Sequence, residues 1–598
     1  MFRKCWLTLT TLSLAVTSSL AFATNSSVSD MTTAEVKGAD VADSVAPELT
    51  TKVTGKESVV ANQYMVAAAN PLAVEAGYKV LASGGSAADA LVAVQTVLGL
   101  VEPQSSGLGG GAFLVYFDAE NDLLTTYDGR ETAPLAVRPE LFLDKNGKPL
   151  KFFDAVVGGR SIGTPGTVKL LADMHQKYGT KAWESLFEPA INYANNGFTV
   201  SQRLASSIER DKERLSRYPE TQSYFFTPDG QPIKQGSQLV NKAYAQTLNI
   251  LAKEGGEAFY TGKIAQDIVA KIHGVSDNPG YLELEDFATY KVVQREPVCA
   301  PYRQYDVCGM GPPSSGALTI GQILGIVSHF DLKTLGPNNP MSWQIIGDAS
   351  RLAFADRGRY IADSDYVPMP HGLLDENYLA QRAALIEKGK ALTEVTPGNP
   401  PWDVPVAYAD DQSIELPSTT HIVIVDKQGN VISMTSTIEN GFGSRVMSNG
   451  FLLNNELTDF SFATHKNGYP IANRVEPGKR PRSSMAPTIV FKDDKPYLAI
   501  GSPGGSRIIG YVAQSLIAHL DWRMDIQDAI SMPRMVNRFG TYDLEQGTEA
   551  ASFKPVLEKM GYQVEVRDLN SGLHGVLIGN GELVGGADPR REGVVLGD

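Results

Sequence analysis

The chain reads Leu416-Pro417-Ser418-Thr419-Thr420-His421-Ile422-Val423-Ile424-Val425-Asp426 near its middle, and this stretch places a Thr-Thr pair at the start of a predicted strand. Alternation from His421 to Asp426, a Gln428-Gly429-Asn430 turn and a second β-rich run from Val431 to Ile438 predict a hairpin. Thr-rich hairpins are common for steric reasons. The stretch alone therefore fits an ordinary hairpin as well as a strand that carries a nucleophile.

Thr419 and Thr437 lie on the paired strands of this predicted hairpin. A threonine hydroxyl is a poor nucleophile until a base lies beside it, and cleavage between Ser418 and Thr419 would supply the new α-amine as that base. Such an amine has an ordinary pKa of about 7.7 to 8.0, which suits proton transfer near neutral pH. His421 shares the strand face of Thr419, but alternation does not bring it into hydrogen-bond range, so we interpret it as structural.

Further motifs lie on both sides of the hairpin. They are Asn70-Pro71-Leu72-Ala73, Gly84-Gly85-Ser86-Ala87-Ala88-Asp89-Ala90, Gly107-Leu108-Gly109-Gly110-Gly111, Asp128-Gly129-Arg130-Glu131-Thr132-Ala133-Pro134, Gly450 to Phe460, Lys479 to Thr488 and Gly501-Ser502-Pro503-Gly504-Gly505-Ser506-Arg507. Together, and in this order, they resemble the γ-glutamyltransferase (γ-glutamyl transpeptidase, glutathione hydrolase) family. The resemblance spans roughly Glu57 to the C-terminus.

The pattern of strands in both halves with helices outside them predicts a layered α/β fold, but it does not order the layers. The resemblance implies the N-terminal nucleophile hydrolase αββα sandwich, two stacked and mainly antiparallel sheets between helical layers. A large subunit of residues 57–418 and a small subunit of residues 419–598 would interlock as one composite domain.

Local patterns predict helices over Leu72 to Ala82 and Ser86 to Leu100, with strands on both sides of the Gly107 loop. The chain from Gly166 to about Ala391 is mostly helical in pattern. The proline-rich run from Pro397 to Pro417 predicts an exposed linker that leads to the cleavage site.

The resemblance implies roles for four residues of the reaction centre. Thr419 would attack the Ser418 carbonyl during maturation and later the γ-carbonyl of a γ-glutamyl amide. Thr437 matches the threonine that hydrogen-bonds this nucleophile. Gly504 and Gly505 match the pair whose backbone N–H groups form the oxyanion hole, a role that suits glycine because no Cβ blocks close approach.

Six further residues match positions that hold the α-amino acid head group of the substrate. Arg130, Ser483 and Ser484 would bind its carboxylate, and a bidentate guanidinium suits that task. Glu456, which is Gln in some members, and Asp459 would contact the ammonium group. Glu439 departs from the pattern because members commonly have Asn there, so the pocket would carry an additional carboxylate.

A second departure is the segment from Asp459 to Ser483, which includes Tyr469 and looks shorter than the lid of well-known bacterial members. A shorter lid leaves open the balance between hydrolysis and transfer, because water exclusion and acceptor binding both depend on a lid.

The 598 residues carry a net charge of −14 and are 42% apolar. This acidity argues against nucleic-acid or anionic-membrane partners, which need a basic surface. Residues 1–23 read as a secretory signal that ends in Ala21-Phe22-Ala23, and no later segment is apolar enough for a membrane anchor. Residues 24–56 have the composition of a disordered lead-in. We therefore expect a periplasmic or secreted protein.

Two cysteines, Cys299 and Cys308, follow the signal segment and flank a Pro-Tyr turn between β-prone runs. An oxidising compartment permits a disulfide across such a hairpin, and two free thiols are the alternative. The scattered histidines and the lack of metal-binding motifs predict no metal site and no cofactor. The glycine-rich loops at Gly107 and Gly501 lack the Gly-Lys-Ser/Thr ending of a phosphate-binding loop.

The sequence thus predicts a self-cleaving γ-glutamyl hydrolase and transpeptidase that acts on glutathione and related compounds, with amino acids or peptides as acceptors. One alternative is a related glutaryl or cephalosporin-type acylase or a poly-γ-glutamate-cleaving enzyme. Another is an inactive, uncleaved homologue that serves as a binding protein. The sequence does not select the physiological substrate, the acceptor or the oligomeric state.

Overall fold

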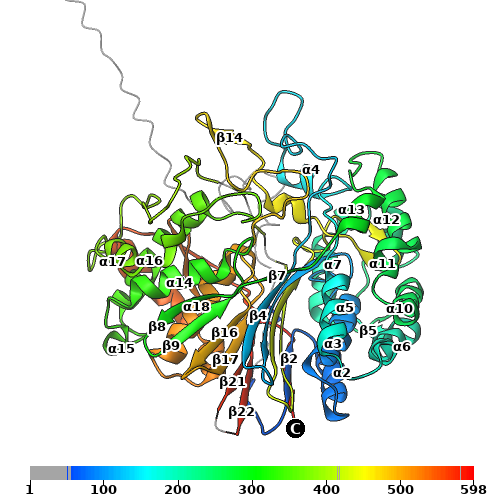
Figure 1. Ribbon diagram of the computed structural model, residues 1–598, viewed down its shortest axis with the longest axis horizontal. Coiled ribbons are helices and arrows are strands. Elements are labelled where there is room, and N and C mark those ends of the chain that lie inside the picture. Colours follow the sequence, from blue (N-terminus) through cyan, green and yellow to red (C-terminus); the bar gives the residue numbers. More distant parts are fainter. Residues whose placement is uncertain (1–49, 52–54, 412, 414, 417, 580) are drawn as a thin grey trace, which may run out of the picture.

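The computed structural model describes residues 50–51, 55–411, 413, 415–416, 418–579 and 581–598 of the intact chain. Two antiparallel sheets of seven strands each form its centre (Figure 1). Sheet I has the order β1 (Val59–Ala61), β22 (Leu583–Ala587), β21 (His574–Ile578), β17 (Lys495–Gly501), β16 (Thr488–Lys492), β9 (Tyr305–Gly309) and β8 (Val298–Tyr302). Sheet II has the order β23 (Val594–Gly597), β2 (Met65–Ala68), β10 (Thr420–Val425), β11 (Val431–Thr437), β3 (Gly111–Asp118), β4 (Leu123–Gly129) and β7 (Val293–Arg295).

Alternating side chains of β10 show how the layers form. Ile422 and Ile424 pack into an apolar core shared with the helices on the outer face of sheet II. Val423 and Val425 point the other way and join a core that includes Ile489 of sheet I. Both faces of this strand are therefore dry, and each fully buried aliphatic side chain contributes about 1.5 to 3 kcal/mol.

A third core lies on the outer face of sheet I, where Leu498 and Ile500 pack against the helices α14 (Gly316–Val327), α16 (Pro340–Tyr360) and α18 (Ile508–Leu520). The order of layers is therefore helix, sheet, sheet, helix, with the two helical layers on opposite sides of the sheets (Figure 1). This arrangement confirms the predicted αββα sandwich.

The helices divide between the two layers. Those on sheet II are α2 (Pro71–Ala82), α3 (Ala87–Val101), α5 (Thr167–Tyr178), α6 (Glu188–Asn196), α7 (Gln202–Arg210), α8 (Lys212–Leu215), α9 (Pro219–Phe225), α10 (Lys242–Glu254), α11 (Ala258–Thr261), α12 (Lys263–His273) and α13 (Leu284–Thr289). Those on sheet I are α14 (Gly316–Val327), α15 (Leu332–Leu335), α16 (Pro340–Tyr360), α17 (Glu376–Ala383), α18 (Ile508–Leu520), α19 (Ile526–Ser531) and α20 (Lys554–Met560).

Shorter elements complete the fold. They are α4 (Phe152–Val156), the 3-10 turns η1 (Trp183–Phe187), η2 (His371–Leu374), η3 (Glu456–Asp459), η4 (Gly505–Arg507) and η5 (Glu549–Phe553), and the strands β5 (Phe198–Thr199), β6 (Gln238–Leu239), β12 (Met447–Ser448), β13 (Phe451–Leu452), β14 (His465–Lys466), β15 (Tyr469–Pro470), β18 (Met535–Asn537), β19 (Thr541–Glu545) and β20 (Gln563–Arg567).

The two helices predicted near the N-terminus begin at capping residues. Asn70 accepts a hydrogen bond from the Leu72 N–H at 3.0 Å to start α2, and Ser86 and Asp89 form a reciprocal capping box at the start of α3. The expectation of strands on both sides of the Gly107 loop is wrong on one side. A strand follows the loop, but α3 precedes it, because its fifteen residues stay buried and helical as far as Val101.

The segments before and after the Ser418–Thr419 bond share both sheets. In sheet II, β10 and β11 lie between β2 and β3, and in sheet I, β16 to β22 lie between β1 and β9. Neither segment could bury its strands alone, since each would expose unpaired sheet edges in the middle of the sandwich.

The predicted signal segment and most of the predicted lead-in lie outside the described residues. At the end of the lead-in, Lys56 is held in place, because its ammonium group donates to the carbonyls of Asp588, Arg591 and Gly593 at 2.6 to 2.7 Å. Within the described part of the chain, no helix is both long enough and apolar enough to span a bilayer.

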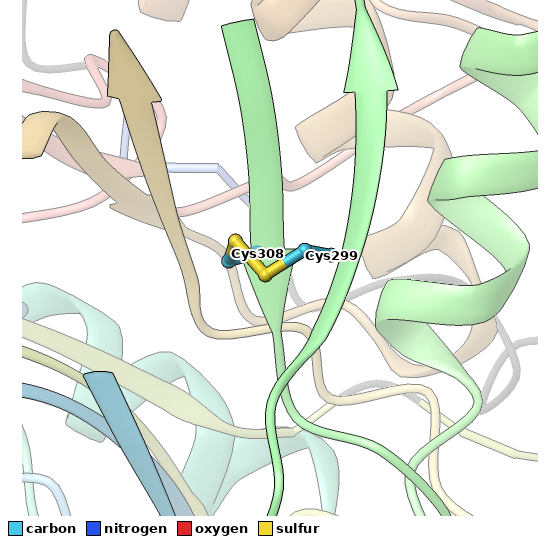
Figure 2. Close-up of a disulfide and its surroundings, with 2 residues drawn as sticks. All are labelled: Cys299 and Cys308. Carbon is cyan, nitrogen blue, oxygen red and sulfur yellow. A yellow bond between two sulfur atoms is a disulfide. The ribbon is translucent and has the colours of Figure 1, made fainter. Parts of the chain in front are cut away.

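A disulfide joins Cys299 of β8 to Cys308 of β9 (Figure 2). These residues are direct partners in the antiparallel ladder, and their Cα atoms lie 4.0 Å apart. Of the two alternatives left open by the sequence, the structure therefore has the bonded one. The bond closes the hairpin at the edge of sheet I.

We expect the double substitution Cys299→Ser and Cys308→Ser to lower the melting temperature of the oxidised protein. A bond that spans nine positions of sequence restricts the unfolded chain by about 2 to 3 kcal/mol. Calorimetry of the wild type with and without reductant provides the control, because reductant should remove the difference between the two proteins. Equal melting temperatures under oxidising conditions would contradict a stabilising bond.

Candidate active site

Two threonine hydroxyls meet beside the Ser418 carbonyl. Thr419 immediately precedes β10 and Thr437 ends β11, and the ladder pairs Thr420 with Ser436. The two Oγ1 atoms lie 3.3 Å apart, and the Thr437 hydroxyl donates to the Ser418 carbonyl at 2.9 Å. Because that bond uses the only hydroxyl proton of Thr437, the Thr419 hydroxyl is the donor between the two. The predicted pairing of Thr419 with Thr437 is therefore present.

Close backbone packing supports the end of β11. A Cβ on Gly110 would lie 2.0 Å from the Thr437 carbonyl oxygen, and a Cβ on Gly109 would lie 2.2 Å from that of Leu452. Only glycine fits such approaches. The Gly107 loop thus serves as a packing surface for the strand that carries Thr437.

The glycine pair after β17 has conformations that favour glycine, with φ of 142° at Gly504 and 58° at Gly505. Gly505 lines the small cavity beside Thr419, whereas Gly504 does not and instead packs against Tyr511. A Cβ on Gly505 would lie 2.8 Å from the Glu415 carbonyl oxygen and 2.9 Å from that of Leu416. The residues before the cleavage site therefore pack directly against this loop.

Glu415 and Leu416 line the small cavity next to Thr419. Both are buried, and the cavity that remains beside them measures about 20 Å³, which is room for one water molecule. The prediction of an exposed linker is therefore wrong at its C-terminal end. The Glu415 carboxylate forms ion pairs with two buried arginines, Arg357 and Arg482, which are distant in the sequence.

The predicted head-group residues are brought together around the same cavity. Arg130, Glu439, Glu456, Asp459, Ser483 and Ser484 all line it. In this uncleaved chain, however, the Arg130 guanidinium forms ion pairs with Glu456 and, at 2.5 Å, with Asp459. The group predicted to bind a carboxylate thus contacts the two side chains predicted to bind an ammonium group.

The hydroxyl groups of Ser483 and Ser484 both accept hydrogen bonds from other groups of the protein. The Ser483 hydroxyl accepts from the Met485 N–H at 3.1 Å, and the Ser484 hydroxyl accepts from Arg357 Nη2 at 2.8 Å. Ser484 therefore lies beside a guanidinium that the sequence did not connect with the site.

Glu439 is a buried carboxylic acid in a left-handed backbone conformation, with φ of 73°. Asn adopts this conformation more readily than Glu does. This preference is consistent with the Asn that is common at this position in the family that the sequence resembles. The carboxyl group accepts from the Leu416 N–H at 3.3 Å and from the Asn455 side chain. Burial, followed by the nearby charge of Glu456, raises the pKa of Glu439 to about 8.

The pKa values of other carboxyl groups of the site are raised as well. Burial raises the pKa of Asp459 well above its ordinary value, although Arg130 opposes the shift, and it also raises the pKa of Glu456. Glu131, behind Glu456, is buried as well, and burial followed by the charge of Glu456 raises its pKa strongly. Carboxylates outnumber cations here, so protonation relieves part of their repulsion.

His421 takes no part in this group. Its Nδ1 lies 2.9 Å from the Thr435 hydroxyl, and burial, followed by the charge of His574, lowers its pKa well below the ordinary range. Among the described residues, no group of three or more His, Cys, Asp and Glu side chains is arranged to hold a metal ion.

The structure adds site residues that sequence reasoning missed. These are Glu131, Arg357, Glu415 and Arg591, whose guanidinium donates to the Thr419 carbonyl at 3.2 Å. Arg357, Glu415 and Arg591 lie outside the motifs that predicted the other site residues, so the sequence gave no reason to select them. Glu131 follows Arg130 in one of those motifs, and this position was the only available indication for it.

The sequence model of the family described as Gamma-glutamyltranspeptidase matches residues 73–598. This chain belongs to the gamma-glutamyltranspeptidase family. It is 37% identical over 558 residues to the glutathione hydrolase proenzyme of Bacillus subtilis (strain 168), with 91% of this chain and 92% of the relative covered. It is 36% identical over 548 residues to the glutathione hydrolase proenzyme of Escherichia coli (strain K12), with 89% and 91% covered.

Among solved structures, the crystal structure of cephalosporin acylase from Bacillus halodurans superposes with a TM-score of 0.80 at 25% identity. The match covers 92% of this chain and 99% of that one. This member of the gamma-glutamyltranspeptidase family therefore has the N-terminal nucleophile hydrolase fold over nearly its whole described length.

The raised pKa of Glu439 predicts a pH-dependent stability. The unfolded carboxyl has a pKa of about 4.3 and the folded one a pKa of about 8, so the folded state keeps a proton that the unfolded chain has lost. The contribution of this group to stability is full below about pH 4.3 and declines as pH rises to about 8.

We therefore expect Glu439→Gln, made in an uncleaved Thr419→Ala protein, to show a smaller loss of melting temperature between pH 5 and pH 8 than its parent. Differential scanning calorimetry across that range measures the slope. Glu582→Gln, which alters an exposed carboxylate, is the matched control and should follow the parent. Parallel curves for Glu439→Gln and the parent would contradict the assignment.

Proposed function

We propose that this chain is a self-processing γ-glutamyl hydrolase and transpeptidase that uses Thr419 as its nucleophile. The observation that carries the proposal is the Thr437 hydroxyl, which contacts both the Thr419 hydroxyl at 3.3 Å and the Ser418 carbonyl at 2.9 Å. One side chain thus holds a nucleophile beside the bond that it would cleave. The family membership and the proenzyme names of the relatives support the same reading.

Maturation would follow from this contact. The Thr419 oxygen attacks the Ser418 carbonyl carbon, a new C–O bond forms, and the C–N bond to Thr419 breaks as its nitrogen takes a proton. Water then hydrolyses the ester, which leaves Ser418 with a free carboxylate and Thr419 with a free α-amine. The Thr437 O–H stabilises the developing oxyanion by hydrogen bonding.

In the mature enzyme, the Thr419 α-amine would act as the base for its own hydroxyl. The hydroxyl attacks the γ-carbonyl of the donor, the amine of the leaving group departs with a proton, and a γ-glutamyl ester remains on Thr419. Water or the amino group of an acceptor then releases it. Gly505 lies where its backbone could support the oxyanion, since it lines the cavity beside Thr419.

Substrate entry requires that the residues before the cleavage site move. A cavity of about 20 Å³ cannot accept a γ-glutamyl group, so the uncleaved chain is closed to substrate. Cleavage frees Ser418 from Thr419 and lets Glu415 and Leu416 leave the pocket. Maturation and the opening of the site are then one event.

The head group of the donor would lie among Arg130, Glu456, Asp459 and Glu439. An α-ammonium group entering between these carboxylates would replace Arg130 as a partner of Glu456 and Asp459, which frees the guanidinium for a carboxylate. The excess of acidic groups in the pocket favours a substrate that brings a positive charge.

We further propose that the protein works in the periplasm or outside the cell. Residues 1–23 have the pattern of a secretory signal, and the Cys299–Cys308 disulfide suits an oxidising compartment.

The purified protein should give two bands on a denaturing gel, and N-terminal sequencing of the smaller fragment should read Thr-Thr-His-Ile-Val. Thr419→Ala should remain a single band because the hydroxyl is lost. Thr437→Val should slow cleavage by about 10- to 100-fold, since it removes a hydrogen bond to developing charge. Thr435→Val, two residues earlier on β11, is the matched control. An uncleaved wild type would favour the inactive binding homologue.

The resemblance to a cephalosporin acylase structure makes a glutaryl acylase the second candidate. We expect γ-glutamyl anilides to react at least about 100-fold faster than glutaryl anilides, because a glutaryl group lacks the ammonium that the pocket carboxylates need. Steady-state rates on the matched pair measure this preference. Equal kcat/KM values would favour the acylase.

A further inference from the structure

The loop between β22 and β23, residues 588–593, crosses from sheet I to sheet II beside Thr419. We call it the C-terminal loop. Its Arg591 guanidinium donates to the Thr419 carbonyl at 3.2 Å and to the Asn570 side chain at 3.3 Å. Cleavage would remove the peptide bond on the N-terminal side of Thr419, so contacts on its carbonyl side must then hold the residue. Arg591 makes such a contact.

Arg591 also packs near the segment that carries the glycine pair. A Cβ on Gly572 would lie 2.6 Å from Arg591 Cδ and 2.7 Å from Pro503 Cγ. Pro503 directly precedes Gly504. The side chains of Arg591 and Pro503 therefore lie together against the backbone of Gly572, and a displacement of Arg591 would affect both sides of the reaction centre.

The chain before β1 runs alongside the C-terminal loop. β1 and β22 are antiparallel partners, and continuing their register places Lys56 opposite Asp588. The Lys56 ammonium group donates to three backbone carbonyls of the loop at 2.6 to 2.7 Å, and these belong to Asp588, Arg591 and Gly593. An ammonium group has three N–H donors, so these carbonyls use its full capacity. One side chain thus joins the start, the middle and the end of the loop.

A second residue of the same segment binds the loop. Thr51 donates to the Arg590 carbonyl through its N–H at 3.0 Å and through its hydroxyl at 3.2 Å. Together, Lys56 and Thr51 supply donors to four carbonyls of the C-terminal loop. The segment predicted as a lead-in therefore fixes the course of this loop at several points.

The contacts of Lys56 reach Arg591 directly, because the Arg591 carbonyl is one of the three that bind its ammonium group. Carbonyl oxygens that converge on one point repel each other unless a positive charge lies between them. If the ammonium group were removed, the loop would have to turn some of these carbonyls toward water. Such a change moves the backbone of Arg591 and with it the guanidinium at the Thr419 carbonyl.

We propose that Lys56 is a positioning residue for the nucleophile. It holds the backbone of Arg591 through the converging carbonyls, and Arg591 holds the Thr419 carbonyl, so that the Thr419 hydroxyl stays aligned during maturation and turnover. This inference rests on the proposed function in taking Thr419 as the nucleophile. It adds a residue at the end of the predicted lead-in to those that support the reaction.

The first experiment tests the ammonium site without catalysis. Lys56→Ala, made in the uncleaved Thr419→Ala protein, removes the part of the lysine that n-propylammonium can replace. We expect this ion to raise the melting temperature of the double variant with the logarithm of its concentration, whereas tetramethylammonium, which has no N–H, does not. Thr419→Ala with Lys495→Ala is the control, because Lys495 is an exposed partner of Asp122. Equal responses to n-propylammonium in the two proteins would overturn the proposal.

The second experiment measures positioning in the mature enzyme. Lys56→Met keeps most of the side-chain volume but removes the donors. It should lower kcat for a γ-glutamyl anilide by about 10-fold and change KM by less than about twofold, as expected for a misaligned nucleophile. Neither Lys56 nor Arg591 lines the cavity beside Thr419, so substrate binding should be little affected. Lys495→Met should match the wild type. A wild-type kcat in Lys56→Met overturns the proposal.

A double-mutant cycle shows whether Lys56 acts through Arg591. Arg591→Met should lower kcat at least as much as Lys56→Met does, and the combined variant should be no slower than Arg591→Met alone, because the two residues form one chain of contacts. Losses that multiply in the combined variant would leave Lys56 with a structural role only and overturn the proposal. A Lys56→Met protein that is slower than Arg591→Met would overturn it as well.

The cycle does not depend on one variant. If Lys56→Met folds but does not mature, the same comparison applies to the rate of cleavage between Ser418 and Thr419, since the Arg591 contact is present in the uncleaved chain. If Lys56→Met does not fold, Lys56→Gln, which keeps an amide donor, takes its place with a smaller expected loss. A wild type without γ-glutamyl activity would contradict the proposed function alone, because the melting experiment does not require activity.

Discussion

The pairing of β10 with β11 is the constraint on which the site depends. Their antiparallel register places Thr419 opposite Thr437 and directs the Thr437 hydroxyl to the Ser418 carbonyl. The same two strands form the middle of sheet II, with apolar cores on both faces. Because so many packed side chains fix this register, the reactive oxygens are held by the whole sandwich rather than by a loop.

The chemistry of the pocket follows from how charges are distributed across the cleavage site. Side chains that follow Thr419 supply the acidic groups around Arg130, and Glu415, which precedes it, neutralises Arg357. In the intact chain every guanidinium of this group has a carboxylate partner. The acidic groups around Arg130 nevertheless outnumber the cations there, so the charges of the intact pocket are paired without being balanced.

Glu439 has two features that are unfavourable for folding. It combines a left-handed backbone with a buried carboxyl group of raised pKa, and both features oppose folding. Its contacts with Leu416 and Asn455 link the segment that must leave with the turn that carries Glu456. Glu439 thus contacts the segment before the cleavage site and lines the cavity beside Thr419.

The sequence by itself determined the hairpin and the helices α2 and α3, because alternation and capping residues are local properties of the chain. The order of its motifs, through the resemblance that they carry, predicted Thr419 as the reactive threonine. The resemblance also named the six head-group residues that the structure places around one cavity, but not Glu415 and Leu416, which line it as well. It could not show that the Pro397 to Pro417 run ends buried, since the burial of Leu416 and Glu415 depends on partners far away in the sequence.

Only the tertiary structure decided which charges meet. Arg357 comes from α16 and Glu415 from the run before β10, and the sheets bring them together. Arg130 was predicted as a ligand for a carboxylate, but the structure shows that its present partners are Glu456 and Asp459. Ion pairing in a pocket depends on distance and burial, and neither is encoded in the spacing of residues along the chain.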